Sequence, residues 1–386
     1  MTVEQIYALT NTVTREILGE TAVLQEDLSN VVDIGNQIFG AASVDNYVKS
    51  LVNHIGRVIF VNRPYRGNAP SVLMDAWEYG SVLEKIRVEL PEASENESWE
   101  LEDGETYNQN VFYKPNVSAK FFNNRVTFEI PVSLTERQVK ESFSNAAQLN
   151  AFLSMITESV EKGLSVRLDS LIMRTINAMT AATISADYAS AALSSKSGIK
   201  AVNLLYLYNT GPNAGQTALT AQQAIFTPAF IRYAAYVMGV YISRLSKLSR
   251  LFNIGGTDKF TGADFLHFIM LSDFVSAADV YLQSDTFHDV FTRLPKAEIV
   301  PYWQGSGTGY GFSDISAINV KIGETTVNAT GILGVAFDRD ALGVSNLNRR
   351  VTTHYNAKAE FTNNYFKTDA GYFNDYNENF VVFFVA

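Results

Sequence analysis

The sequence contains no cysteine, which excludes disulfide bonds and thiolate metal sites. Cations are also few: 30 lysines and arginines stand against 40 aspartates and glutamates, so the formal net charge is −10. Because the chain has no basic run, we exclude a general nucleic-acid binder, which needs clustered Lys and Arg to neutralise phosphates. No apolar run approaches the roughly 18 residues that a membrane helix needs, and residues 1–5 show no leader pattern. The sequence therefore predicts a soluble chain, made in the cytoplasm, with no membrane partner.

Apolar and aromatic residues, in contrast, are abundant. The apolar fraction is 47%, and the chain carries 25 phenylalanines and 19 tyrosines in 386 residues. This composition is typical of a globular protein with two or three domains or one elaborate domain. Tyrosine combines a large contact area with a polar tip, so the aromatic content favours extensive interfaces as well as cores. Without disulfides, stability must come from packing or assembly.

Residues 133–179 predict a long amphipathic helix. Ser133 followed by Glu136 fits a capping box, which places the start of the helix at Ser133. At about 1.5 Å per residue such a helix would reach roughly 70 Å, with a break expected at Ser144-Asn145 or a bend at Gly163. Its apolar residues recur three or four positions apart, as one helical face requires: Val139, Phe143, Ala146, Leu149, Leu153, Ile156, Val160, Leu164, Leu168, Leu171, Ile176 and Met179.

An acidic stretch lies between Tyr79 and Ile130, where strand patterns flank a dense run of carboxylates. Like charges at this density repel one another, so we expect an extended loop that projects into solvent. Its return leg, residues 121–130, alternates as a half-buried strand does. The carboxylates of the run are Glu92, Glu95, Glu97, Glu100, Glu102, Asp103 and Glu105.

The second half of the chain predicts alternating strands and helices of an α/β or α+β domain. Thr220 is an expected helix cap, and Pro228 favours two helices over one within residues 220–252. The apolar terminus, residues 380–385, needs a sheet to join. Further strands are expected at residues 199–208, 266–271, 297–299, 301–303, 315–322 and 331–337, and a short helix begins at Asp273.

No constellation for catalysis, cofactor binding or metal binding is found. The histidines have no HExxH spacing and no cysteine companions: His54, His267, His288 and His354. Asp264 and His267 lie one turn apart, but no Gly-x-Ser-x-Gly elbow frames a nucleophile. The glycine run 305–311 lacks the Lys-Ser/Thr ending of a phosphate loop, and residues 338–340 are interpreted as a turn at a strand end.

The order of these parts resembles the major capsid (head) protein of tailed bacteriophages, with the HK97-like fold, and its end resembles short-tailed phages with small heads. The residues that carry the resemblance are the strand-to-helix junction 126–133 and the segments 264–278, 331–338 and 355–365. The resemblance implies an α+β class with an N-terminal arm at 1–46, the start of a P-domain at 47–78, an E-loop at 79–130, the P-domain with its spine helix at 131–210, an A-domain at 211–345 and a return to the P-domain at 346–386.

The resemblance also implies function: pentamers and hexamers of a non-enzymatic chain build an icosahedral or prolate head, in the virion, around double-stranded DNA that is not bound sequence-specifically. We expect a separate scaffolding protein, a portal and decoration proteins as partners, with assembly in the bacterial cytoplasm. Welding of Lys85 or Lys114 to Asn356, as in some relatives, is not expected. Two alternatives stay open: an encapsulin-like shell, and a hydrolase or polysaccharide-binding protein built around Asp264 and His267. The carboxylates expected to meet basic groups of a neighbouring subunit are Glu95, Glu97, Glu100, Glu102, Asp103 and Glu105.

Overall fold

The computed structural model describes residues 11–12, 14–15, 70–74, 83–91, 93, 95–96, 102–104, 110–135, 146–283, 294–304, 309 and 311–386. The predicted N-terminal arm therefore lies outside the described residues, apart from four positions. Strands are β1 (Leu73–Met74), β2 (Leu83–Val88), β3 (Val117–Phe122), β4 (Arg125–Thr135), β5 (Ala201–Asn203), β6 (Leu266–Leu271), β7 (Glu298–Val300), β8 (Ile318–Ile322), β9 (Thr325–Ala329), β10 (Ile332–Asp338), β11 (Leu342–Asn356), β12 (Phe361–Asn374) and β13 (Phe380–Phe384). Helices are α5 (Ala146–Tyr188), α6 (Leu204–Thr210), α7 (Ala221–Ala224), α8 (Pro228–Leu245), α9 (Ser272–Gln283) and α10 (Phe312–Ile315), with single 3-10 turns at Leu193–Ser195 and Ala263–Phe265.

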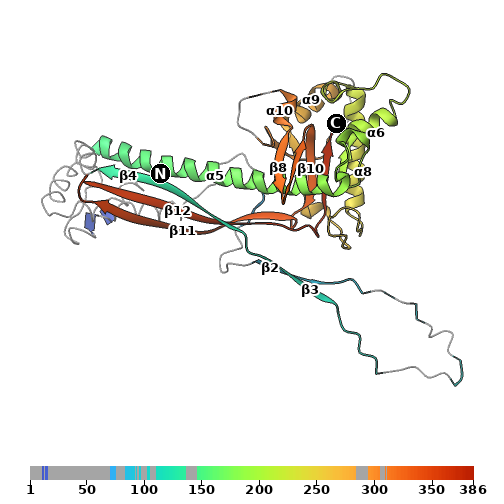
Figure 1. Ribbon diagram of the computed structural model, residues 1–386, viewed down its shortest axis with the longest axis horizontal. Helices are drawn as coiled ribbons and strands as arrows, with labels where there is room; N and C mark the ends of the chain where they lie inside the picture. Colours follow the sequence, from blue (N-terminus) through green and yellow to red (C-terminus); the bar gives the residue numbers. More distant parts are fainter. Residues whose placement is uncertain are drawn as a thin grey trace.

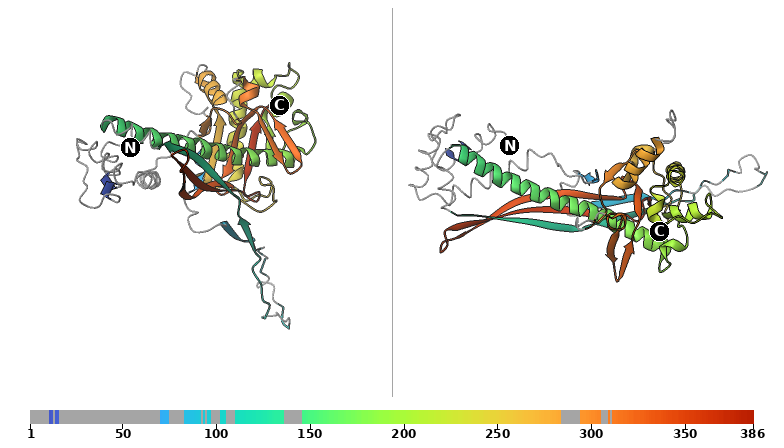
Figure 2. Two further views of the ribbon diagram at one scale, coloured as in Figure 1. Left: turned by 60° about the vertical axis from the view of Figure 1, so that its left-hand side comes forward. Right: turned by 90° about the horizontal axis from the view of Figure 1, so that it is seen from above.

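Two sheets share the long helix α5 (Figure 1). The first sheet has four strands in the order β1-β11-β12-β4, and the second has five in the order β5-β13-β10-β6-β7. Helix α5 runs along the first sheet and continues onto one face of the second, and Figure 2 shows the same arrangement from two further directions. The predicted α+β class is confirmed.

The predicted helix is confirmed in its middle and wrong at both described limits. Its apolar stripe is buried at every predicted position whose side chain is described, from Val160 to Met179. The helix continues to Tyr188, nine residues beyond the predicted end at Met179. Ser133 does not cap it: β4 runs to Thr135, and the Ser133 hydroxyl donates a hydrogen bond to Asn363 Oδ1 at 2.6 Å. Pairing of β4 with β12 along its whole length overrides the local capping pattern.

Gly163 does not interrupt the helix. It lies where α5 crosses β4, and a Cβ on Gly163 would stand 2.8 Å from Cδ1 of Ile130. The absence of a side chain therefore allows helix and strand to approach closely, and this contact explains the glycine.

The terminal apolar segment forms β13, an inner strand of the five-stranded sheet, paired with β10 on one side and β5 on the other. Helix α5 covers one face of this sheet and α6, α8 and α9 cover the other, so all five residues of β13 are buried. A strand covered on both faces has a continuous apolar sequence, which is the pattern that residues 380–385 show. The expectation that the terminus joins a sheet is confirmed.

Several shorter predictions are also confirmed. Thr220 caps α7 in a capping box with Gln223, Pro228 begins α8, and β6 spans the predicted residues. The predicted strand 199–208 is wrong after Asn203, because the Asn203 side chain accepts a hydrogen bond from the N–H of Tyr206 and starts helix α6. The predicted strand 121–130 is interrupted at Asn123 and Asn124, where β3 ends and β4 begins.

Residues 301–303 form no strand. The side chain of Trp303 is 1% exposed, and its Nε1–H donates to the carbonyl of Ile332 at 2.8 Å. Two consecutive aromatic residues after a proline resemble the sequence of a strand. In the structure, however, the Trp303 ring holds a loop against the core.

Candidate assembly interface

Strands β2 and β3 form an antiparallel hairpin that projects from the body of the molecule (Figure 1). Lys85 pairs with Lys120, and Val88 pairs with Val117. Successive side chains of a strand point to opposite faces, so this register divides the hairpin into two different surfaces. A two-stranded hairpin is only marginally stable alone, which makes its contacts with the body important.

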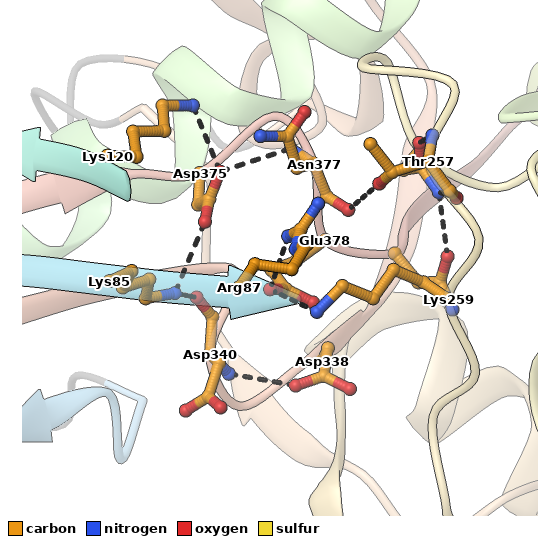
Figure 3. A network of polar contacts seen from close by, with 12 residues as sticks. Lys85, Arg87, Lys120, Thr257, Lys259, Asp338, Asp340, Asp375, Asn377 and Glu378 are labelled. Carbon is orange, nitrogen blue, oxygen red and sulfur yellow. Dashed lines mark hydrogen bonds and ion pairs between the residues drawn. The ribbon is translucent and has the colours of Figure 1, made fainter. Parts of the chain in front are cut away.

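The inner face of the hairpin is cationic and rests on the loop that connects β12 to β13. The Lys85 ammonium lies 3.4 Å from Asp375 Oδ2, and the Lys120 ammonium lies 3.0 Å from Asp375 Oδ1 (Figure 3). Lys85 also donates to the carbonyl of Asp340. Between these ions Phe122 packs on Phe373, with ring centroids 5.1 Å apart. Charge and an aromatic pair together attach the hairpin to the body.

Asp375 is the most deeply placed ion of this cluster, with a side chain only 1% exposed. Burial by itself would raise the pKa of this carboxyl group, but the hydrogen bond from Lys120, the charge of Lys85 and the N–H of Asn377 act in the opposite direction and lower it overall. Its own N–H donates to the carbonyl of Ala341 at 2.7 Å, which fixes the loop. Asp375 is therefore ionised at neutral pH and available to both lysines.

Glu378 makes the same kind of contact two residues further along β2, on the same face of the strand. Its Oε1 lies 3.2 Å from Arg87 Nη2 and 2.7 Å from the ammonium of Lys259, which belongs to the loop after α8. The Thr257 hydroxyl of that loop donates to the carbonyl of Asn377 at 2.8 Å. Two cations therefore surround each of the two buried carboxylates at the base of the hairpin.

The outer face of the hairpin is exposed and mostly apolar, with Glu84 as its charged residue. Ile86, Val88, Val117 and Phe121 are 67%, 60%, 55% and 62% exposed. All four alternate with residues of the inner face, so they share one surface. Exposed apolar patches of this kind mark interaction sites more often than chance surface residues.

The acidic run follows β2 in the sequence. Among the predicted interface residues Glu95, Glu102 and Asp103 are described and exposed, whereas Glu97, Glu100 and Glu105 lie outside the described residues. Gly104, with φ of +98°, makes the turn that follows Asp103. For the described carboxylates Glu95, Glu102 and Asp103, the structure shows no ion pair with a basic group among the described residues of the same chain.

Asp375 and Glu378, which bind the hairpin, were not predicted from the sequence. The available signal was the alternation in Leu83–Val88, where Lys85 and Arg87 fall on one face of a strand. Cations on an inward-facing strand require buried anions, but only the fold shows which anions these are. Lys85 is engaged by Asp375, and Lys114 and Asn356 belong to different segments with no contact described between them.

The region proposed for the hydrolase alternative has a different arrangement. Asp264 is exposed in a 3-10 turn, and His267 lies in β6 with its ring stacked on Phe337 and its Nδ1 3.6 Å from Glu298 Oε1. The contact with His267 is the largest contribution that lowers the pKa of Glu298 to about 2, and burial only partly opposes it. Glu298 also accepts hydrogen bonds from the N–H and hydroxyl of Ser71, so it connects the segment next to β1 with β7. This is a connection between two sheets.

Residues 338–340 form the predicted turn: the N–H of Asp340 donates to Asp338 Oδ1 at 2.9 Å, and the Thr261 hydroxyl donates to Asp338 Oδ2 at 2.8 Å. Within the described part of the chain, no group of three or more His, Asp or Glu side chains is placed to hold a metal ion. None of the helices in the described residues is both long enough and apolar enough to cross a membrane.

A model of one protein family, described as Phi29-like phage major capsid protein, matches residues 10–384. No curated protein matches the sequence. Among solved structures, the capsid of Staphylococcus phage Andhra aligns with 9% identity and a TM-score of 0.47, covering 84% of this chain and 86% of that chain. The capsid of the cyanophage P-SCSP1u aligns with 13% identity and a TM-score of 0.45, covering 84% and 88%.

Proposed function

The chain belongs to the Phi29-like phage major capsid protein family, and on that premise we propose that the outer face of its β2–β3 hairpin binds a neighbouring copy in the phage head. The family is structural, so the protein is a capsid component and not an enzyme, and it belongs to the virion. The resemblance to the major capsid protein of tailed phages and the HK97-like fold expected from the sequence are confirmed. The match favours a phage head over the encapsulin-like and hydrolase alternatives.

The finer expectations are part of this proposal. They comprise closed pentamers and hexamers, the domain limits predicted from the sequence, assembly in the host cytoplasm, and partnership with scaffolding, portal and decoration proteins around DNA. The acidic run of residues 92–105 is proposed to contact a neighbouring subunit. Family membership supports self-assembly, because symmetric shells are built from repeated contacts between identical chains.

The observation that carries the proposal is the two-sided hairpin. Its cationic face is satisfied within the chain by Asp375 and Glu378, while its apolar face, around Ile86 and Val88, is left to solvent. Apart from Glu84, this outer face offers apolar burial, at about 25 cal/mol per Å² removed from water. A second copy of the chain supplies the surface that the isolated subunit lacks.

The test replaces two outer residues with lysine, in Ile86→Lys/Val88→Lys. Electron microscopy of the expressed protein, alone and with the proteins encoded beside it, should show heads for the natural chain and none for the variant, because two buried lysines would be left unpaired. The variant should elute as a folded subunit with unchanged thermal stability.

The matched control is Ile86→Val/Val88→Ile, which keeps the face apolar and should form normal heads. Normal heads from the lysine variant would contradict the proposed docking face. A uniform small species from the natural chain under all conditions would contradict the whole proposal.

A further inference from the structure

A cavity of about 540 Å³ lies where the hairpin meets the body. Sites for small molecules typically have volumes of about 300–1,000 Å³, so this cavity is large enough to hold one. Four cations and three carboxylates line it: Lys85, Arg87, Lys120, Lys259, Asp340, Asp375 and Glu378. The balance between the two signs therefore decides what the cavity can bind.

The cations exceed the carboxylates that face them. Asp375 and Glu378 have side chains only 1% and 8% exposed, and each is shared by two cations. In Figure 3 the carboxylate of Asp340 points away from the cluster, and Asp340 contacts Lys85 through its backbone carbonyl. Two carboxylates therefore face four cations, which leaves the cavity with an excess of two positive charges in a chain whose net charge is −10.

The cations also have N–H donors that the two buried carboxylates do not use. A guanidinium group has five N–H donors and an ammonium group has three. Within the described residues, Arg87 donates one hydrogen bond from its side chain, to Glu378. The ammonium groups of Lys120 and Lys259 donate one each, and these side chains are 40% and 26% exposed. An anion that enters the cavity can therefore accept charge-assisted hydrogen bonds without breaking the ion pairs.

The size of the cavity favours an elongated anion with several charges. Its volume equals that of roughly eighteen water molecules at about 30 Å³ each, so a single phosphate group would fill only a small part of it. The cations are also spread out, because Lys85 and Arg87 are two residues, or about 7 Å, apart along β2. Arginine and lysine both hold phosphate oxygens, the arginine with its planar fork. A chain of linked phosphates fits this volume and this charge.

We infer that the cavity binds a free oligophosphate anion, such as tripolyphosphate. Arg87 belongs to β2, Lys120 to β3 and Lys259 to the loop after α8, so the bound anion connects both strands of the hairpin to the body. The inference goes beyond the proposed function, since it concerns a single subunit and needs no second copy. Binding should weaken as salt is raised, because these cations are partly exposed.

Calorimetric titration of the full-length subunit with sodium tripolyphosphate, at constant ionic strength, tests this inference. Lys120→Gln/Lys259→Gln removes the two most exposed cations of the cavity and should bind at least about tenfold more weakly, because two charge-assisted hydrogen bonds are lost. Orthophosphate should also bind the natural chain at least about tenfold more weakly than tripolyphosphate, and equal affinities would contradict an elongated ligand. Tighter binding of adenosine triphosphate would assign the cavity to a nucleotide and overturn the choice of a free anion.

The matched control is Lys321→Gln/Lys367→Gln, which removes two positive charges from β8 and β12, outside the cavity, and should bind as the natural chain does. Lys120→Arg/Lys259→Arg keeps the charges and should retain binding, which separates the loss of charge from damage to the hairpin. Hydrogen exchange should show added protection of the β2 and β3 amides when tripolyphosphate is present. Equal weakening by both glutamine variants, protection confined to other elements, or no binding to the natural chain would overturn this inference. Normal head assembly by the same protein would leave the proposed function intact.

Discussion

The five-stranded sheet and the β2–β3 hairpin are both built from strands but are stabilised in different ways. Every residue of β13 is buried between helices, so apolar packing on two faces holds that strand. In β2 each second residue is exposed, and the hairpin is attached to the body by two buried carboxylates, Asp375 and Glu378, and by the packing of Phe122 on Phe373. Burial fixes the sheet in the isolated chain, whereas the hairpin keeps an exposed face that we propose as the contact with a second chain.

Mutations in the five-stranded sheet should therefore affect the stability of the subunit, whereas mutations on the outer face of the hairpin should affect assembly of the shell. A change in the sheet removes packing that the subunit needs before it meets any partner. If the proposed function holds, a change on the outer face of the hairpin should remove contacts that exist only in the assembly. Two phenylalanines in strands, Phe383 in the sheet and Phe121 in the hairpin, are 0% and 62% exposed and allow the comparison to be made with one residue type.

The largest expected effect is that of Phe383→Ala. The Phe383 ring contacts Tyr241 and Phe268, with centroids 5.5 Å and 5.9 Å away. Its removal should lower the free energy of unfolding by about 3–5 kcal/mol, because the covered sheet cannot collapse around the cavity. Denaturant unfolding of the isolated subunit measures this change. Phe121→Ala is the control and should stay within about 0.5 kcal/mol, as surface substitutions usually do. Equal losses from both variants would remove the distinction between sheet and hairpin.

A smaller and more local effect is expected for Asp375→Asn. The substitution leaves Lys85 and Lys120 without their shared anion, and a lost hydrogen bond to a charged group costs about 1.5–3 kcal/mol. Because the lysines are partly exposed, we expect about half of this range. Hydrogen exchange should show faster exchange of the amides of β2 and β3, with protection of β13 unchanged. The control Asp369→Asn removes the surface pair with Arg350 and should leave the hairpin amides unchanged. Uniform loss of protection across both regions would show that the hairpin is not a separate unit.

How far the sequence predicts the structure depends on whether a pattern is local. The stripe from Val160 to Met179 predicts a helix because its apolar residues recur three or four positions apart. The run 380–385 predicts a buried strand because its apolar residues are continuous. Both patterns depend only on neighbouring residues in the sequence. Ser133 misleads, because pairing with Asn363, which is 230 residues away, decides its state. The contact of Lys85 with Asp375 spans 290 residues and has no local signal on the anion side. The sequence therefore predicts a hairpin that carries charged residues, but it does not predict that Asp375 attaches this hairpin to the body.

The smallest expected effect concerns Glu298, at the edge strand β7, where the five-stranded sheet uses an ionic contact. Its folded pKa of about 2 lies below the ordinary value of 4.5, so its stabilising effect is full above pH 4.5 and is lost as pH falls toward 2. With a side chain 38% exposed, solvent screening reduces the contribution to about 1 kcal/mol. Urea unfolding of the natural chain and of Glu298→Gln at pH 7 and pH 3 should show a difference at pH 7 that shrinks at pH 3. A difference that is equal at both pH values would assign the role of Glu298 to packing, and the edge of the sheet would then be held in the same way as its centre.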